Sequence, residues 1–383
     1  MDRLLFSLET PSETFWETYS HLWRNSAERS PFQAPHLLRY LATHTSEAVY
    51  AFVAKRQGAP RGAVLLKRRG QIHTFLSDLK TDENAFVFDR TATMEEQRAF
   101  SRALLRTFCE RGQSLELNHQ VLEAAYLPLL FESAREQGLW CALLPHSVCP
   151  MVVAATPAEL GNYFSRSQRY RYYANRLRTQ ARATFCAHTD DRSVSNWARA
   201  YCETHIRRWA QTATPSAFRM AQQRIFFLNC LRAWHADALC ARFSLCLPDG
   251  RPIALAVGVL QPPALIFHAT TFDPEFARYS PGKALIYHIA QWMSTNNLRV
   301  LHFGDGNEPY KYDTANSERR MGRVFVCTGE NLPFRAKAKA FQWLKEHPHM
   351  EQFYRLRMKP AASKIALLIH LLQETIESIL LSL

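Results

Sequence analysis

The sequence lacks paired cysteines. Its nine cysteines are scattered over 383 residues, and no two are spaced as Cys-x-x-Cys. This absence argues against a zinc ribbon or a disulfide framework and predicts reduced, mostly buried thiols in a cytosol. The histidines also lack a metal-ligand spacing such as His-x-x-x-His with a nearby acid. We therefore predict no metal site.

Long apolar runs are missing as well. No stretch of about 20 uncharged apolar residues occurs, so we expect no transmembrane helix. The N-terminus carries an acid within its short apolar stretch and has no small-residue cleavage site, so we expect no secretory signal. These absences favour a cytoplasmic protein, with peripheral contact at the inner membrane as an alternative.

Composition and charge describe a folded, basic protein. Hydrophobic residues make up 47% of the chain and aromatic residues 12%, which is the range of globular proteins. The length predicts two domains or one large α/β unit. The formal net charge of +13 predicts a surface that attracts anions such as phosphates, nucleic acid or acidic headgroups, without distinguishing among them.

Periodicity and turn residues predict a mixed α/β fold in two units. In the first unit, strands over 49–55 and 63–67 form a hairpin, and a helix over 93–111 follows. The pattern restarts after residues 145–150, where we place a domain boundary. The predicted parts are an N-terminal domain (1–150), a C-terminal domain (151–335) and a helical C-terminal tail (336–383).

The second unit has a strand order that constrains its chemistry. Strands over 239–247, 252–260 and 264–271 precede the turn 279–284 and a helix that runs to about residue 295, and a strand predicted to be parallel follows over 299–303. This order places a helix N-terminus beside the carboxyl end of a strand.

That helix begins with a turn suited to an anion. A helix N-terminus presents unpaired N–H groups and a partial positive charge, and glycine lets a phosphate approach the backbone closely. An ordinary turn before a helix is the alternative interpretation. The residues of the turn are Tyr279, Ser280, Pro281, Gly282, Lys283 and Ala284.

The loop after the last strand carries acid–base groups. It contains two carboxylates, a tyrosine and a lysine at the carboxyl edge of the predicted sheet, where such groups often act in catalysis. Alternatively, Asp305 caps a turn and Lys311 pairs with Glu308 on the surface. The loop reads Phe303, Gly304, Asp305, Gly306, Asn307, Glu308, Pro309, Tyr310, Lys311 and Tyr312.

These motifs, in this order and spacing, resemble a known family. Phe272-Asp273-Pro274, Ser280-Pro281-Gly282, Phe303-Gly304-Asp305-Gly306 and Glu308-Pro309-Tyr310-Lys311-Tyr312 are similar to those of the CelD-type acetyltransferases of bacterial cellulose and exopolysaccharide gene clusters. That family is a branch of the GNAT superfamily of N-acetyltransferases. The resemblance covers most of residues 30–327 and is strongest in the last third.

The resemblance implies two GNAT-like folds in tandem, as in the Fem-type transferases that add amino acids to peptidoglycan precursors from aminoacyl-tRNA. It also implies that acetyl-CoA is a co-substrate held by Tyr279, Ser280, Gly282, Lys283 and Ala284. The family's pyrophosphate loop is usually Gln/Arg-x-x-Gly-x-Gly/Ala; Gly282 and Ala284 match it, whereas Tyr279 replaces Gln or Arg, and Pro281 lacks an N–H donor. The resembling segment that begins at Arg208 and Trp209 is assigned to substrate binding.

In a GNAT reaction an amine attacks an acyl thioester directly, so the protein positions two substrates and moves protons. We predict Asp305 or Glu308 as the base, Tyr310 as the acid and Lys311 as a substrate or anion contact. Two alternatives stay open, namely that Tyr310 is a packed aromatic residue and that Lys311 is the main substrate-orienting residue.

A basic helix predicted over 163–182 has six arginines, four tyrosines and no acid. Its face with Tyr170, Ala174 and Leu177 should pack inward, so the arginines should point outward. They suit the phosphates of a lipid-linked sugar, a nucleotide or tRNA, with a merely solvated face as the alternative. The arginines are Arg166, Arg169, Arg171, Arg176, Arg178 and Arg182.

The tail over 365–383 has apolar residues at helical spacing, from Ile365 to Leu383, and an acidic opposite face. Such a helix favours packing on its own domain or in a homodimer over a membrane surface.

The leading hypothesis is an acetyl-CoA-dependent N-acyltransferase that acts on an amine of a sugar or small metabolite in polysaccharide assembly. One alternative is an aminoacyl-tRNA-dependent Fem-like transferase, supported by the tandem fold and the basic helix. The other is a non-catalytic GNAT-fold scaffold that holds a polysaccharide synthase through the tail.

Overall fold

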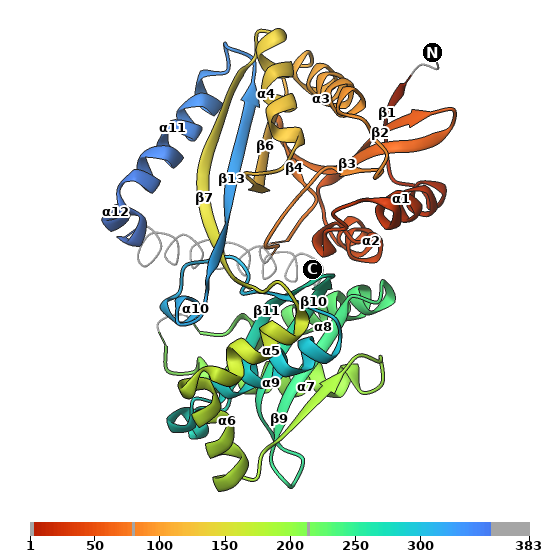
Figure 1. Ribbon diagram of the computed structural model, residues 1–383. Coiled ribbons are helices and arrows are strands. Elements are labelled where there is room, and N and C mark those ends of the chain that lie inside the picture. The colour runs from red at the N-terminus through yellow and green to blue at the C-terminus, as the bar shows by residue number, and fades with distance from the viewer. Residues whose placement is uncertain (1–3, 79–80, 213–214, 354–383) are drawn as a thin grey trace, which may run out of the picture.

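The computed structural model describes residues 4–78, 81–212 and 215–353, and within them the strands join one 13-stranded mixed sheet. The strand order is β1-β2-β3-β4-β6-β13-β7-β12-β11-β10-β9-β8, with β5 paired to β3 (Figure 1). The strands are β1 (Leu5–Glu9), β2 (Ala48–Arg56), β3 (Ala59–Arg69), β4 (Ile72–Phe75), β5 (Val87–Phe88), β6 (Ser114–Val121), β7 (Trp140–Val153), β8 (Thr184–His188), β9 (Cys240–Cys246), β10 (Pro252–Gln261), β11 (Ala264–Phe272), β12 (Val300–His302) and β13 (Ser317–Cys327).

Helices cover this sheet along its whole length (Figure 1). They are α1 (Glu13–Asn25), α2 (Pro35–Thr43), α3 (Met94–Cys109), α4 (Tyr126–Glu136), α5 (Pro157–Arg166), α6 (Gln168–Gln180), α7 (Val194–Arg208), α8 (Ala221–Ala236), α9 (Pro281–Thr295), α10 (Pro309–Tyr312), α11 (Leu332–Glu346) and α12 (Pro348–Phe353). Short 3-10 turns are η1 (Pro31–Gln33), η2 (Ala217–Arg219) and η3 (Pro274–Tyr279). Among the described residues, no helix combines the length and the apolar character needed to cross a bilayer.

The N-terminal half contains the predicted hairpin and helix. Strands β2 and β3 meet at Gln57 and Gly58, which both have positive φ, as a two-residue hairpin turn requires. Helix α3 begins at a capping box formed by Thr93 and Glu96. Both elements were predicted from the sequence, with boundaries shifted by a few residues.

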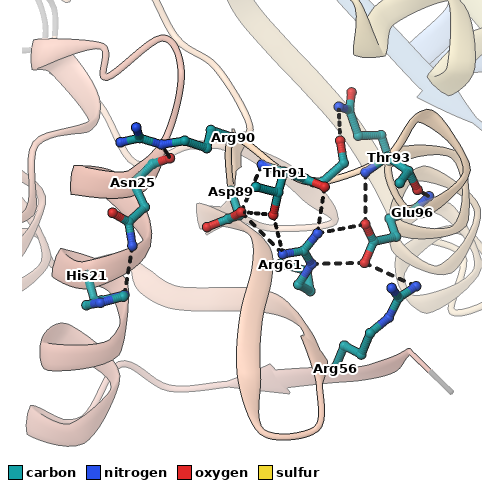
Figure 2. Close-up of polar contacts among 11 residues, drawn as sticks. His21, Asn25, Arg56, Arg61, Asp89, Arg90, Thr91, Thr93 and Glu96 are labelled. Atoms are coloured by element: carbon teal, nitrogen blue, oxygen red, sulfur yellow. Dashed lines mark hydrogen bonds and ion pairs between the residues drawn. The ribbon is translucent and has the colours of Figure 1, made fainter. Parts of the chain in front are cut away.

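A polar network fixes the loop that precedes α3 (Figure 2). The Thr93 N–H donates to Glu96 Oε2 at 2.8 Å, and the Glu96 N–H donates to Thr93 Oγ1 at 3.2 Å. Arg61 binds the same carboxylate through Nε and Nη2 at 2.9 and 3.0 Å, and it also binds Asp89 at 3.2 Å. Arg56 lies 3.3 Å from Glu96. One buried carboxylate therefore joins the β2–β3 hairpin to the start of a helix.

This network predicts a pH-dependent stability. Hydrogen bonding from Arg61 lowers the pKa of Glu96 to about 2, against the opposing effect of burial and with further help from the Thr93 N–H. Because the folded-state pKa lies below the ordinary value of 4.5, the stabilisation is present above about pH 4.5 and is lost as the pH falls towards 2. We expect Glu96→Gln to lower the free energy of unfolding at pH 7 by about 2 kcal/mol.

Urea unfolding between pH 2 and 7 measures this effect. In Glu96→Gln the fall in stability between pH 4.5 and 2 should be smaller than in the wild type. The control Glu95→Gln, which changes an exposed neighbouring residue, should show the same fall as the wild type. Equal slopes in the wild type and Glu96→Gln would contradict the assignment.

The two halves share strands. Most of β7 pairs with β13, while its last residues, 151–153, pair with β12 of the C-terminal half. Strand β13 pairs on its other edge with β6 and so lies between two strands of the N-terminal half. The boundary suggested at residue 150 falls inside β7. Pro145 and Pro150 favoured a turn there, but Pro145 adjoins a β-bulge, a position that accepts proline within a strand.

The C-terminal half has the predicted strand order. Strands β9, β10 and β11 are antiparallel neighbours, and β12 pairs with β11 in parallel through the connection that contains α9. The single helix expected over 163–182 is wrong: α5 and α6 are separated at Ser167, whose backbone is extended (ψ 106°). The expected inward face of α6 is confirmed, since Tyr170, Ala174 and Leu177 are buried.

Apolar packing also joins the halves. One core cluster combines Trp16 and Trp23 of α1 with Trp197 of α7 and Trp234 of α8. Helices from both halves therefore pack around the same core. The tail helix expected over 365–383 lies outside the described residues.

Candidate functional site

The turn predicted to receive phosphates is open. Ser280 has a left-handed backbone (φ 49°) and caps α9, whose first turn contains Pro281 and Gly282. The N–H groups of Lys283 and Ala284 both bond back to the Ser280 carbonyl. A Cβ atom placed on Gly282 would meet nothing within 4 Å. A side chain at position 282 would therefore meet no other atom, so the backbone at Gly282 can be approached closely.

Two arginines lie beside this turn. The guanidinium groups of Arg176 from α6 and Arg278 from η3 lie 4.7 and 4.8 Å from the centre of the Tyr279 ring. Arg176 also donates to the Arg278 carbonyl at 3.1 Å, and Arg278 donates to the Tyr279 hydroxyl at 2.9 Å. Tyr279, which departs from the family pattern, thus holds two cations close to the start of α9.

Lys283 has a different environment. Its Nζ lies 2.7 Å from Asp313, which also pairs with Arg169 of α6 at 3.0 Å. Burial would raise the pKa of Asp313, but the hydrogen bond and charge of Lys283, with those of Arg169, lower it. Lys283 therefore ties α9 to α6 and to the end of α10 through an ionised carboxylate.

Arg208 and Trp209 stand at the carboxyl end of β11. The Arg208 guanidinium lies 3.9 Å from the centre of the Phe272 ring and 5.6 Å from that of Trp209. Burial lowers the pKa of Arg208. Trp209 stacks on His205. Because β11 leads through η3 into α9, Arg208 adds a cation at the end of the strand that leads to the open turn.

The Lys311 ammonium makes its hydrogen bonds within its own loop. Its Nζ is buried and donates to the carbonyls of Gly304, Asp305 and Gly306 at 3.3, 2.7 and 3.3 Å. Glu308 pairs with the same ammonium at 2.8 Å. An ammonium has only three N–H donors, so Lys311 shapes the loop and has none left for a substrate.

Tyr310 is the acid-type group of this loop. Its side chain is partly exposed, and burial together with the charge of Glu308 raises its pKa to about 12. The hydroxyl is therefore protonated at neutral pH and able to donate a proton or hydrogen bond.

Asp82, from the N-terminal half, connects the loop to a histidine. Its Oδ1 accepts the Asp305 N–H at 3.2 Å, and its Oδ2 lies 3.1 Å from His268 Nδ1. Gly304 has positive φ, and a Cβ there would lie 3.3 Å from Asp82. Burial would raise the pKa of Asp82, but the hydrogen bond to His268 and the charges of His268 and His302 lower it.

His268 is the extra residue of a β-bulge. The pairing of β10 with β11 shifts between Val257 and Gly258, which leaves His268 without a partner residue. Bulges re-aim side chains and occur often beside active sites. The imidazole packs against Phe32 and Trp234, with ring centres 5.5 and 5.1 Å away. With Nδ1 held by Asp82, Nε2 remains for a substrate.

His268 lines a cavity of about 630 Å³ between the two halves. A cavity of this volume accommodates a small-molecule ligand. Its walls combine aromatic rings with charged groups of both signs. They include Lys67, Asp78, Glu116, Phe218, Phe226 and Trp234.

Sequence reasoning thus located the α9 turn and the loop after β12 but missed Asp82, His268 and Arg278. A histidine inside the apolar strand 264–272 was the available signal for one of them. Asp82 gave none, because it lies far away in the sequence and reaches the site only through the fold.

Residues 165–312 match the family described as "Acetyltransferase (GNAT) domain". The chain therefore carries a GNAT acetyltransferase domain, the domain of an acyltransferase enzyme. No curated protein sequence matches the chain.

Solved structures share the fold over most of the chain. FemX aligns with a TM-score of 0.61 at 9% identity, covering 86% of this chain and 99% of FemX. L-PGS from Bacillus licheniformis gives 0.54 at 9% identity, with 88% and 98% covered. A conserved protein of unknown function from Bacteroides thetaiotaomicron gives 0.58 at 10% identity, with 85% and 100% covered. The predicted mixed α/β fold class is confirmed, and these structural matches extend over both halves of the chain.

Proposed function

We propose that the protein is an acetyl-CoA-dependent N-acyltransferase that acetylates an amine held between its two halves. The observation that carries this proposal is the open N-terminus of α9 at the end of β11, the strand whose bulge residue His268 lines the interdomain cavity. In the proposed division into units 1–150 and 151–335, the acetyl-CoA site lies in the second unit, and residues of both units form the site for the amine.

The α9 turn suits the diphosphate of coenzyme A. Gly282 leaves room for close approach, and the helix N-terminus favours negative charge. Arg176 and Arg278 add two cations at Tyr279, and Arg208 adds one at Phe272. Pro281 supplies no N–H, so these side chains compensate for a donor that the family loop has and this chain lacks.

The cavity suits an amine with apolar and polar parts. Asp78 contributes a carboxylate to the wall, whereas Glu116 is already paired with Arg323 and Lys337, and the rings of Phe218, Phe226 and Trp234 can pack against an apolar face. A sugar amine or small amino metabolite fits this description. The link to polysaccharide assembly rests on the CelD-type resemblance alone, and the use of acetyl-CoA implies the cytoplasm.

We assign the base to His268. Glu308 is engaged by Lys311, and Asp305 Oδ1 is buried and grouped with His119 and His146, whereas His268 lines the cavity itself. In this proposal the amine nitrogen attacks the acyl carbon, its proton passes to Nε2, and the carbon–sulfur bond breaks. Asp82 orients the ring and stabilises its charged form, and Tyr310 protonates the departing thiolate.

Calorimetry with acetyl-CoA, followed by an assay of free thiol release, tests the proposal. We expect saturable binding and thiol release that depends on an added amine, screened first among amino sugars. No binding at millimolar acetyl-CoA would overturn the proposal.

A second candidate donor is aminoacyl-tRNA, because Arg171, Arg178 and Arg182 are exposed. Transfer from aminoacyl-tRNA but not from acetyl-CoA, with binding that weakens steeply in salt, would favour this Fem-like reaction. The scaffold alternative depends on the tail helix expected over 365–383, which lies outside the described residues.

A further inference from the structure

We infer that His119, His146 and Asp305 form a binding site for a divalent transition-metal ion of the zinc type. One ligand atom from each residue lies within 4.8 Å of the other two. The residues come from β6, β7 and the loop after β12. They are far apart in the sequence, so no ligand spacing within the sequence reveals them, and the prediction of no metal site missed them.

Two β-bulges turn the histidines to the same place. Strand β13 lies between β6 and β7, and its pairing with both shifts next to Gly322. On β6 the shift falls at Asn118 and His119, and His119 has a positive φ of 54°. On β7 the shift leaves His146 as the extra residue. The backbone is thus irregular at the same level of both flanking strands, and one of the irregular residues is strained. Irregularities of this kind are typical of functional sites.

The polar atoms of this group lack partners. His119 Nδ1, His146 Nδ1 and Asp305 Oδ1 are each buried and make no hydrogen bond within the described part of the chain. A buried polar atom without a partner costs about 1–3 kcal/mol. One shared ligand would satisfy all three residues together.

The surroundings hold Asp305 in position. Its N–H donates to Asp82 at 3.2 Å, and its carbonyl accepts from Lys311 at 2.7 Å. The nearby guanidinium of Arg323 is paired with Glu116 at 3.1 Å and packs on Phe341. Glu116 therefore holds this guanidinium in an ion pair, and Asp305 is held by contacts outside the metal's own ligand set, as in natural metal sites.

The ligand set selects the class of ion. Two imidazoles and one carboxylate suit zinc, cobalt or iron(II) rather than magnesium or calcium, which prefer oxygen ligands. Ligand atoms around tetrahedral zinc, at about 2.0–2.2 Å from the metal, lie about 3.3 Å apart, so modest side-chain rotations would close the site. Three protein ligands leave one position open.

Chelator-treated full-length protein, titrated with Zn²⁺ by calorimetry and with Co²⁺ by visible absorption, tests the inference. We expect one ion per chain and the absorption bands of four-coordinate Co²⁺ without a thiolate-to-cobalt band, which separates this site from binding by the nine cysteines. His119→Ala, His146→Ala and Asp305→Asn should each weaken binding by about 100-fold or more. His188→Ala, a strand histidine outside the site, should bind normally.

No uptake at millimolar Zn²⁺ by folded wild-type protein would overturn the inference, and so would equal affinity in the three ligand variants. The Co²⁺ spectrum of the wild type tests the inference even if a variant does not fold. Because the titration contains neither acetyl-CoA nor amine, its outcome is separate from the proposed acyltransfer.

Discussion

Replacing His268 by alanine is expected to lower kcat/KM for acetyl transfer by about 100- to 10,000-fold, the range that general base catalysis contributes. The proposed base has Nδ1 fixed by Asp82 at 3.1 Å, which leaves Nε2 to accept the amine proton. Asp82→Asn should act in the same direction, because it removes the charge that stabilises the protonated imidazole. The affinity for acetyl-CoA should change little, since His268 is not one of the residues of the α9 turn.

A second histidine–aspartate pair provides the control. His36 Nδ1 lies 2.7 Å from Asp237, outside the cavity, so His36→Ala removes a comparable pair and should keep full activity. Thermal melting of each variant separates a loss of fold from a loss of catalysis. Activity of His268→Ala within about threefold of the wild type would exclude His268 as the base.

Gly282→Asp should weaken coenzyme A binding by about 30- to 100-fold, which corresponds to about 2–3 kcal/mol. The new carboxylate would stand where the diphosphate is proposed to bind and would repel it. The fold should tolerate the change, because a Cβ on Gly282 meets no atom within 4 Å and an acid in the first turn of a helix is favourable.

Gly329→Asp is the matched control, since Gly329 also has open space around it and lies far along the chain from α9. Calorimetry with coenzyme A measures both variants, and their melting temperatures should equal or exceed that of the wild type. Unchanged affinity in Gly282→Asp would mean that the α9 turn is not the phosphate site, even if the protein proves to be an acyltransferase.

The sequence predicted elements that depend on local pattern. The β2–β3 hairpin, the β9–β11 strands, α9 and the parallel strand β12 each have a periodicity or a turn that stands out within a short window. Strands β7 and β13 were not predicted, because both are defined by pairing across more than 150 residues. Pro145 and Pro150 also favoured a domain boundary within the residues that form β7.

The candidate site likewise combines residues that short sequence motifs indicate with residues that only the fold brings together. The turn at Gly282 and the loop with Asp305 carry short motifs, so the sequence alone singles them out as candidates. Lys311 was expected to contact a substrate or anion, but the folded loop wraps three carbonyls around it. The partners of His268 and Asp305 come from the N-terminal half, and no local sequence pattern predicts a contact that tertiary structure makes.

The insertion of β13 between β6 and β7 bears on how the polypeptide is made. While residues 1–316 leave the ribosome, β6 and β7 have no neighbour on the edges that β13 later fills. Unpaired edges invite association with other chains. A nascent chain halted before residue 317 is therefore exposed to aggregation, and synthesis of the last β-strand completes the half that was translated first.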